Sequence, residues 1–454
     1  MTKIHADRAL TADGWQNDVL VQIGVDGRIA HVGQGPHAPE AHRVATLLPA
    51  PVNAHSHAFQ RAMAGLTEQR GPDPRDSFWT WRRLMYRFLD RLTPEHVEAI
   101  TAFVQMEMLE AGFATNVEFH YVHHQPGGVP YDTLSELSQR VAQAAAETGI
   151  GLTLLPVQYQ YGGLDQRPLT GGQKRFGTDL DQFARLHEGA ARAVAGLPDD
   201  CRMGVAPHSL RAVDAAALPQ LLALTDGPFH MHLAEQKAEV EEVHQILGQR
   251  PVEWVLDTLE PDARMTFIHC TQMQPHETRG LARSGAVAGL CPITESNLGD
   301  GIFDGVNWLD HGGRMSIGSD SNIRISLSEE LRVLDHSQRL RDHSRAALAT
   351  PDHSTGRRLL EAALSGGALS AGRKTGQIAV GYEADLMALD GTHPDLDGLC
   401  GDTLLDTYVF AGDDRMVRDV WSAGRHMVRE GRHIKKDTIT RAYKAALRDL
   451  RADL

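Results

Sequence analysis

Eight short apolar runs, separated by longer segments with helical spacing, constrain the fold of this chain more than any other feature. Helical periodicity is clearest in residues 94–112, 132–149 and 212–226. Strands that alternate regularly with helices favour a parallel sheet, and eight repeats predict a (β/α)8 TIM-type barrel. A doubly wound open sheet is the alternative, but no G-x-G-x-x-G motif follows any run. The runs are residues 47–57, 115–121, 151–159, 202–209, 228–235, 265–270, 286–295 and 314–320.

The two ends of the chain differ from this middle part. Residues 18–35 alternate apolar and polar side chains around an Asp-Gly turn, which is typical of a hairpin. A similar pattern of short alternating runs and turns returns in residues 376–391 and 415–433. We therefore predict a small β-sandwich domain formed from residues 1–48 and 375–454, and a barrel formed from residues 49–374.

The last stretch, residues 438–454, has helical spacing and is expected to form a helix within the small domain. Thr438 and Thr440 are the candidate N-caps, because a threonine hydroxyl can accept a hydrogen bond from a free N–H of the first turn.

Composition excludes several classes of protein. The net charge of -14 argues against nucleic-acid binding, and no run approaches the roughly eighteen apolar residues of a membrane span. The four cysteines lie far apart without a C-x-x-C pair, which argues against a disulfide framework and a thiolate zinc site. The first residues lack the apolar stretch of a signal peptide. We expect a cytoplasmic protein.

Ionisable and hydroxyl side chains gather at the ends of the predicted strands. In a barrel the carboxyl ends of all strands meet on one face, where chemistry takes place in enzymes of this architecture. We therefore predict that these side chains share one site. They are His55 and His57 after the first run, Tyr121 after the second, His208 after the fourth, His232 and Glu235 after the fifth, His269 after the sixth and Asp320 after the eighth.

Four of these residues have the character of metal ligands. His55 and His57 are two residues apart in a strand and so face the same side. His232 and Asp320 can complete the set from the fifth and eighth strands. Three imidazoles and one carboxylate suit Zn²⁺ or another divalent transition metal, with one position left for water. A single H-x-H at a strand end is often structural, but the joint placement favours the metal site.

Other histidines are expected to play structural parts. His230 precedes His232 in a second H-x-H and lies one layer deeper, so we predict a packed histidine there. His123 and His124 fall in a loop rich in Pro and Gly and are expected to be solvated. Glu235 itself has an alternative interpretation, as a favourable negative charge at the start of a helix.

These residues resemble the ligand pattern of the amidohydrolase superfamily: H-x-H after strand one, His after strands five and six, Asp after strand eight, and a sheet domain from both termini. No lysine stands at the end of strand four, where the sequence is "APHS". The chain is therefore similar to the mononuclear, deaminase-type branch, marked by "HLAE". Ala50 and Asn53 replace the glycine and aspartate that usually lead into the first strand, which affects the turn but leaves the ligands in place.

Five longer stretches resemble one family within this superfamily, the N-formimidoyl-L-glutamate deiminases, over essentially the whole chain. The resemblance implies zinc-dependent hydrolysis of N-formimino-L-glutamate to N-formyl-L-glutamate and ammonia, a reaction of histidine degradation. The stretches are "HSHAFQRAMAGLTE", "SFWTWRRLMYR", "EFHYVHH", "APHSLRAV" and "SNLGDGIF".

The same resemblance implies roles for the site residues. One zinc ion per subunit at His55, His57, His232 and Asp320 would lower the pKa of its water towards about 7. Asp320 is then expected to accept the proton of this nucleophile. Glu235 is expected to shuttle a proton to the leaving nitrogen, and His269 to stabilise the developing charge on oxygen.

A dicarboxylate substrate needs cations and hydrogen-bond donors in the pocket. Arg211, with His208 beside it, is the best candidate, because a guanidinium binds a planar carboxylate through two parallel bonds. Gln60 and Tyr121 are further candidate donors. Arg82 lies in the segment after strand one, and the resemblance implies that this segment crosses a homodimer interface and offers Arg82 to the neighbouring site. A surface ion pair is the alternative for either arginine.

Two other functions remain open at this point. The first is deamination of a heterocyclic base, such as guanine or cytosine, on the same metal site; Arg211 and Arg82 count against it. The second is a metal-binding scaffold without catalysis, which the presence of Glu235, His269 and Asp320 disfavours.

Overall fold

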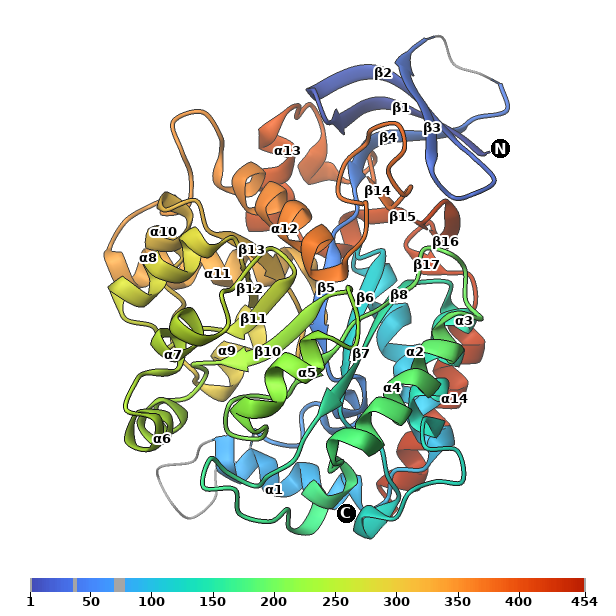
Figure 1. Cartoon of the computed structure of the whole chain (residues 1–454). Helices are drawn as coiled ribbons and strands as arrows, with labels where there is room; N and C mark the ends of the chain where they lie inside the picture. Colours follow the sequence, from blue (N-terminus) through green and yellow to red (C-terminus); the bar gives the residue numbers. More distant parts are fainter. Residues whose placement is uncertain (1, 36–38, 69–77, 453–454) are drawn as a thin grey trace.

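The computed structural model describes residues 2–35, 39–68 and 78–452, and the side chains of residues 78–83 lie outside this description. Figure 1 shows a barrel with its helices in the lower part and a smaller sheet above it, to which both ends of the chain contribute strands. Among the described residues, no helix has the length and apolar character needed to cross a membrane.

The strands follow one another through both parts of the molecule. They are β1 (Thr2–Thr11), β2 (Gly14–Ile23), β3 (Ile29–Gln34), β4 (His42–Pro49), β5 (Val52–Ser56), β6 (Thr115–His120), β7 (Gly151–Gln158), β8 (Arg202–Met203), β9 (Ala206–Pro207), β10 (Phe229–Leu233), β11 (Met265–His269), β12 (Val287–Leu290), β13 (Arg314–Ile317), β14 (Leu386–Leu389), β15 (Val417–Ser422), β16 (Arg425–Arg429) and β17 (Arg432–His433).

The α-helices mostly fall between the barrel strands. They are α1 (Phe78–Leu89), α2 (Pro94–Glu110), α3 (Glu136–Thr148), α4 (Leu180–Val194), α5 (Leu218–Leu222), α6 (Lys237–Leu247), α7 (Pro251–Thr258), α8 (Pro275–Ser284), α9 (Pro292–Leu298), α10 (Gly305–Asp310), α11 (Leu327–Asp342), α12 (Thr355–Ala371), α13 (Asp402–Asp406) and α14 (Lys436–Leu450).

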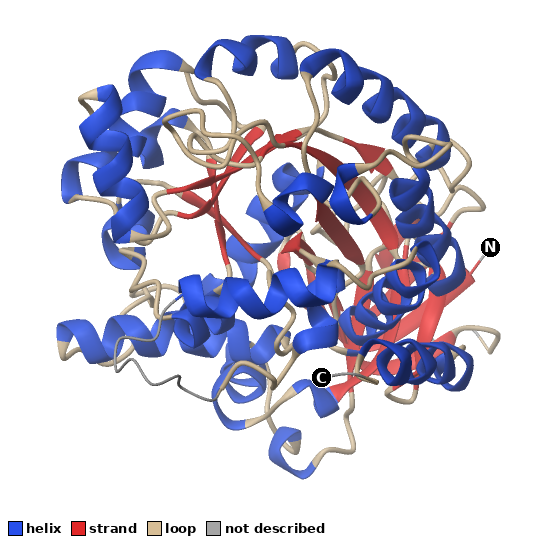
Figure 2. Ribbon diagram, turned by 90° about the horizontal axis from the view of Figure 1, so that it is seen from below, coloured by secondary structure: helices blue, strands red, loops and turns tan. Residues whose placement is uncertain are grey.

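The barrel sheet is parallel and runs in the order β10-β11-β12-β13-β5-β6-β7-β8, with β9 also paired to β7. Parallel bridges from Val205 to Phe229 and from Ser209 to His232 join its two ends. In Figure 2 the strands occupy the middle of this part and helices surround them. The predicted (β/α)8 barrel is confirmed. Its strands are buried on both faces, which explains why they read as continuous apolar runs.

The fourth barrel strand is interrupted between β8 and β9 by Gly204. A Cβ atom at this position would lie 2.4 Å from the carbonyl oxygen of Pro228, so only glycine allows the two strands to approach this closely. The helix expected over residues 212–226 is also shorter than predicted. Only α5 forms there, after a 3₁₀ turn at Ala215–Ala217, because Pro219 cannot stand inside a longer helix.

The small sheet has the order β17-β16-β15-β14-β4-β1-β2-β3, so a block of C-terminal strands meets a block of N-terminal strands where β14 pairs with β4, and no barrel strand takes part. The predicted sheet domain built from both termini is confirmed. The sheet curls back on itself: Arg28 forms a bridge with Glu383, and the ring of His42 lies 5.5 Å from that of Trp421. The curled layers enclose an apolar cluster that includes Ile4, Val19, Val21, Leu386 and Trp421.

Helix α14 begins earlier than predicted, and both proposed N-caps are wrong. Thr438 lies inside the helix, as does Thr440, and the residue at the N-cap is Lys435. The reason lies in β17, where the Nδ1 atom of His433 accepts the N–H of Lys435 at 3.1 Å and turns the chain into the helix at once. The helix packs on α2 of the barrel, where Phe103 stacks on Tyr443 with ring centroids 3.8 Å apart.

Candidate metal centre and active site

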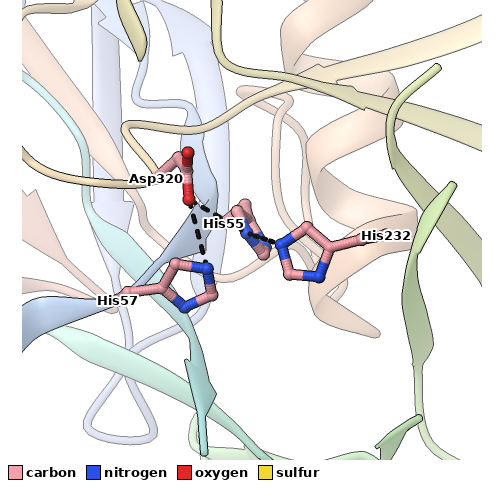
Figure 3. Close-up of side chains that lie close together, drawn as sticks. All are labelled: His55, His57, His232 and Asp320. Carbon is pink, nitrogen blue, oxygen red and sulfur yellow. Dashed lines mark hydrogen bonds and ion pairs between the residues drawn. The ribbon is translucent and has the colours of Figure 1, made fainter. Parts of the chain in front are cut away.

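Four predicted ligands meet at the carboxyl end of the barrel (Figure 3). His55 comes from β5, His57 follows it, His232 comes from β10, and Asp320 follows β13. Oδ1 of Asp320 lies 3.2 Å from Nε2 of His57 and 3.4 Å from Nε2 of His55. Nε2 of His55 is also 3.1 Å from Nε2 of His232. All four residues are at most 5% exposed.

These spacings fit a tetrahedral metal ion. Ligand atoms at about 2.1 Å from such an ion lie about 3.4 Å from one another. The measured separations of 3.1, 3.2 and 3.4 Å are close to this value. The donor set of three imidazoles and one carboxylate suits a divalent ion of borderline softness.

The backbone fixes which nitrogen His57 and His232 offer. Nδ1 of His57 donates to the carbonyl oxygen of Phe119 at 3.0 Å, and Nδ1 of His232 donates to that of His208 at 3.0 Å. The Nε2 lone pair of each ring is therefore directed to the common centre. Burial lowers the pKa of His55 to about 3, so this imidazole is neutral and ready to bind a cation.

A buried hydrogen-bond chain joins the first and last barrel strands beneath the ligands. Nδ2 of Asn53 donates to Oγ of Ser319 at 2.8 Å, and this hydroxyl donates to Oδ1 of Asn322 at 2.6 Å. Nδ2 of Asn322 in turn donates to Oγ of Ser56 at 3.1 Å. Asn53, which replaces the usual aspartate, thus holds β5 against the turn that carries Asp320.

The backbone around the site is strained. Asp320 has φ 44°, His269 φ 70° and Ala234 φ 51°, all in the left-handed region that side chains other than glycine avoid. Such conformations cost roughly 1–3 kcal/mol each and persist where the surrounding structure enforces them. Here they stand at the ends of the strands that supply the site residues, and they aim those side chains at one centre.

His269 lies beside the four ligands. Its Nδ1 is 3.2 Å from Oε1 of Glu295, and its Nε2 is 4.0 Å from Oδ2 of Asp320. Burial by itself lowers the pKa of His269, but the Glu295 hydrogen bond and the charges of Glu235 and Asp320 outweigh it and raise the pKa to about 10. The ring therefore carries a proton at neutral pH and can donate it in a hydrogen bond to an oxygen in the site.

Glu235 follows β10 and lines a cavity that is also lined by His57, His232 and Asp320. The carboxylate that serves the start of α6 belongs to another residue: Glu239 accepts the N–H groups of Ala234 at 3.1 Å and of Glu235 at 2.9 Å. The alternative role of Glu235 as a helix-terminal charge is therefore filled by Glu239. Burial raises the pKa of Glu235 above its usual value, which favours the protonated form that a proton donor needs.

One small cavity of about 50 Å³ brings together the metal ligands and the candidate substrate contacts. Of the predicted site residues whose side chains the structure describes, His55 is the one that does not line it. Arg82 belongs to α1, but its side chain falls outside the described residues. The lining residues are His57, Gln60, Met85, Tyr121, Tyr159, Phe176, His208, Arg211, His232, Glu235, His269, Leu298 and Asp320.

The lining of the cavity also carries hydrogen-bond donors. Nε2 of Gln60 donates to the hydroxyl of Tyr121 at 2.7 Å, and Nη1 of Arg211 donates to the hydroxyl of Tyr159 at 3.4 Å. The ring of His208 lies 4.7 Å from that of Tyr159. Guanidinium, amide and phenol groups therefore stand together where an anionic group can reach them.

Sequence reasoning missed several residues of the site. Tyr159 ends the third apolar run as Tyr121 ends the second, so the same rule of strand ends finds it. Phe119 packs against the rings of His55 and His232 with centroids 5.0 and 4.6 Å away, and it stands two residues before Tyr121. For Glu295, within α9, the sequence carries no comparable signal.

Of the two predictions made for the remaining histidines, one is confirmed and one is wrong. His230 is packed as expected, and its Nε2 donates to the carbonyl oxygen of Ser370 at 2.8 Å. His123 and His124 were expected in solvent, but both are buried. The segment around Arg175 covers them, and its carbonyl oxygen accepts both of their backbone N–H groups, at 2.9 and 3.0 Å.

Comparison with known proteins gives two family matches. The family described as "Amidohydrolase family" matches residues 46–427, and "Formimidoylglutamate deiminase HutF, N-terminal domain" matches residues 1–43. A formimidoylglutamate deiminase of Pseudomonas aeruginosa is 45% identical over 454 residues, covering 99% of this chain and 100% of the relative.

Solved structures agree with the fold. An amidohydrolase from Brucella melitensis superposes with a TM-score of 0.94 at 43% identity, covering 99% of this chain and 100% of that one. An adenosine deaminase from Xanthomonas campestris with bound zinc has a TM-score of 0.82 at 20% identity, covering 99% of this chain and 98% of that one, so its likeness extends to the fold alone. Together with the ligand geometry, the match to the amidohydrolase family identifies a divalent metal site.

Proposed function

The chain belongs to the amidohydrolase family, and from that premise we propose that it hydrolyses the C=N bond of N-formimino-L-glutamate to give N-formyl-L-glutamate and ammonia. One structural observation carries this proposal: a metal site, a proton-accepting carboxyl group and an arginine face the same cavity. The 45% identity to the Pseudomonas aeruginosa deiminase over the full length supports the same substrate.

We propose that His55, His57, His232 and Asp320 hold one zinc ion per subunit. When bound there, such an ion would lower the pKa of a coordinated water towards about 7 and so make hydroxide available at neutral pH. The lowered pKa of His55 and the carbonyl acceptors behind Nδ1 of His57 and His232 support this assignment, because they favour lone pairs over protons at the nitrogens that would face the ion.

The proton transfers are assigned to three side chains. Asp320 accepts the proton of the attacking water: Oδ1 is the oxygen that lies beside His55 and His57 as a ligand, which leaves Oδ2 for the proton. Glu235 carries a proton to the nitrogen, so that ammonia leaves instead of an amide anion. His269 donates from Nε2 to the oxygen that becomes negative during attack, and Glu295 holds this ring in position.

The substrate carboxylates are assigned to the hydrogen-bond donors that line the cavity. Arg211 binds one carboxylate through its guanidinium, and His208, Gln60 and Tyr121 donate to the remaining oxygens. We propose that Arg82 completes this set from the neighbouring subunit of a homodimer, as the family resemblance implies. Mixing Arg82→Ala subunits with Glu235→Gln subunits tests this: hybrid dimers regain one complete site if Arg82 acts across the interface, and regain nothing if it acts within its own chain.

A cytoplasmic location completes the proposal. The four cysteines are free thiols, as expected in a reducing compartment. We also propose that residues 1–48 with 375–454 and residues 49–374 act as two domains, which the separate hydrogen bonding of the two sheets supports.

The decisive experiment measures ammonia release from N-formimino-L-glutamate, guanine and cytosine with the zinc-loaded protein. We expect turnover of the first substrate only, and a formyl proton in the NMR spectrum of the product. Release of L-glutamate and formamide would mean that the other C–N bond is cleaved. Turnover of guanine or cytosine without turnover of N-formimino-L-glutamate would overturn the proposal. Relatives named as deaminases of heterocycles are more distant, such as an 8-oxoguanine deaminase of Pseudomonas aeruginosa at 28% identity, so the heterocycle alternative is not favoured.

A further inference from the structure

We propose that the small domain contains a second transition-metal site, formed by His42, Asp419 and His426, which binds a divalent ion such as Zn²⁺ or Ni²⁺. Each residue offers one ligand atom, and these atoms lie within 4.8 Å of one another. The cluster is separate from the active site, because its strands, β4, β15 and β16, all belong to the small sheet.

The three side chains converge on one carboxylate oxygen. Oδ1 of Asp419 lies 2.8 Å from Nε2 of His426 and 3.5 Å from Nε2 of His42. Ligands of a tetrahedral ion are about 3.4 Å apart, so the first contact lengthens by roughly half an ångström on binding while the second already fits. Two imidazoles and a carboxylate form a donor set suited to Zn²⁺, Ni²⁺ or Co²⁺.

Unsatisfied polar atoms point to a missing partner. Nε2 of His42 and Oδ2 of Asp419 are buried without a hydrogen-bond partner in the described part of the chain. Buried polar groups normally have such partners, and a bound ion would supply one for His42. A hydrogen-bonded Asp419–His426 pair by itself explains those two residues but gives His42 no role.

The surroundings allow an ion to enter. The side chain of His42 is 39% exposed, whereas that of Asp419 is 2% exposed, so the site opens to solvent on the histidine side. Water can fill the fourth position from there. Nε of Arg418 lies 3.6 Å from Oδ2 of Asp419, on the oxygen away from the histidines, and its charge weakens binding relative to the active site.

The position of the cluster gives the ion a structural consequence. His42 belongs to the N-terminal segment of the chain, whereas Asp419 and His426 belong to the C-terminal segment. An ion bound by all three joins the facing layers of the curled sheet. Because the unfolded chain does not hold the three ligands together, binding stabilises the folded state.

Metal content provides the first test. After equilibrium dialysis against excess free Zn²⁺, we expect two equivalents per chain in the wild type and one in His42→Ala. The matched control is His31→Ala, which removes an exposed imidazole from β3 of the same domain. This variant should still bind two equivalents of zinc per chain. One equivalent in the wild type, or two in His42→Ala, would overturn the proposal.

Trp421 provides a second, local readout. Its indole stacks on the ring of His426 with centroids 4.3 Å apart, so a paramagnetic ion at the site quenches its fluorescence. Ni²⁺ added to protein that holds one equivalent of zinc should quench the tryptophan fluorescence of the wild type. This quenching should be absent in Trp421→Phe. The apparent Kd should rise at least tenfold in His426→Gln, whose amide can keep a hydrogen bond to Asp419.

The two readouts keep the test decisive when one variant folds poorly. Thermal unfolding without added metal identifies such a variant, and His426→Gln then replaces His42→Ala in the dialysis. Equal quenching in the wild type and in His426→Gln would contradict the assignment, as would the absence of quenching in the wild type.

Discussion

His269 and Glu295 form a buried pair in which Nδ1 of the imidazole lies 3.2 Å from Oε1 of the carboxylate. The same oxygen accepts the backbone N–H of Cys291 at 2.9 Å, so the carboxylate is itself held in place. A ring fixed at Nδ1 presents Nε2 to the cavity in one orientation. Glu295 therefore acts on the reaction through His269, as a positioning residue.

Glu295→Gln should lower kcat by about 10- to 100-fold, the usual cost of losing a partner that orients a site residue. The amide keeps the size of the side chain but loses the charge that holds the imidazolium. We expect zinc content and KM to change little, which metal analysis and steady-state kinetics can measure. An unchanged pH profile together with wild-type kcat would remove Glu295 from this role.

Glu235→Gln should retain the metal and lower kcat by about 10³-fold, because an amide of the same shape cannot carry the proton to nitrogen. Single-turnover kinetics on zinc-loaded protein measures the chemical step directly. Glu239→Gln is the control, since that residue accepts backbone N–H groups of the same loop but does not line the cavity. Equal rates for Glu235→Gln and the wild type would exclude proton transfer by Glu235.

Arg211→Lys should raise KM by about tenfold or more, because an ammonium group cannot form the two parallel bonds that a guanidinium forms with a carboxylate. Zinc content should stay at the wild-type value. Arg185→Lys, an exposed arginine of α4, serves as the matched control. A lower kcat without a higher KM would place Arg211 in the chemical step instead of substrate binding.

Removal of the metal with a chelator should abolish ammonia release and lower the midpoint of thermal unfolding by several degrees. The four buried ligands bind the ion only when folded, and binding at a thousand times Kd stabilises by about 4 kcal/mol. The experiment belongs in the His42→Ala background, so that only the active site responds. Asp320→Ala in that background should show no zinc-dependent shift, and a persisting shift would place the ion elsewhere.

Acid should destabilise the protein through His120 of β6. Burial lowers the pKa of this residue in the folded state to about 3, below the ordinary value of 6.5. As the pH falls below 6.5, His120 binds a proton in the unfolded chain but not in the folded chain. Its contribution to the free energy of unfolding is therefore fully present above pH 6.5 and is lost as the pH falls towards 3. The contribution is about 1.4 kcal/mol per pH unit.

His120→Leu removes this contribution, and the loss of unfolding free energy between pH 6.5 and pH 4.5 should become correspondingly smaller. Urea unfolding at several pH values measures it. His31→Leu, at an exposed position of β3, is the control and should keep the wild-type slope. Identical slopes for His120→Leu and the wild type would show that His120 is not the responsible group.

The sequence predicted the barrel and the positions of the site residues because both follow from local rules. A strand that is buried on both faces is apolar along its length, and His55, His232 and Asp320 stand where such runs end. Features that depend on distant segments were not predictable. His123 is buried by the segment of Arg175, which lies about fifty residues further along the chain.

Two further misses have the same origin. Helix α14 starts at Lys436 because His433 of the preceding strand accepts the backbone N–H of Lys435. The positions of the threonines do not indicate that contact. Glu295 of α9 becomes relevant only through its hydrogen bond to His269, which ends β11 and lies twenty-six positions earlier in the sequence. Spacing within one element cannot reveal such a pair.

The pairing of β4 with β14 has a consequence for how the protein is made. Leu48 pairs with Met387, so β4 leaves the ribosome long before its partner strand, and the whole barrel is synthesised in between. Until then one edge of β4 stays exposed and able to pair with other chains. The emerging polypeptide therefore needs protection from aggregation at its N-terminal strands, and a transcript truncated before β14 would yield a product that cannot complete its small sheet.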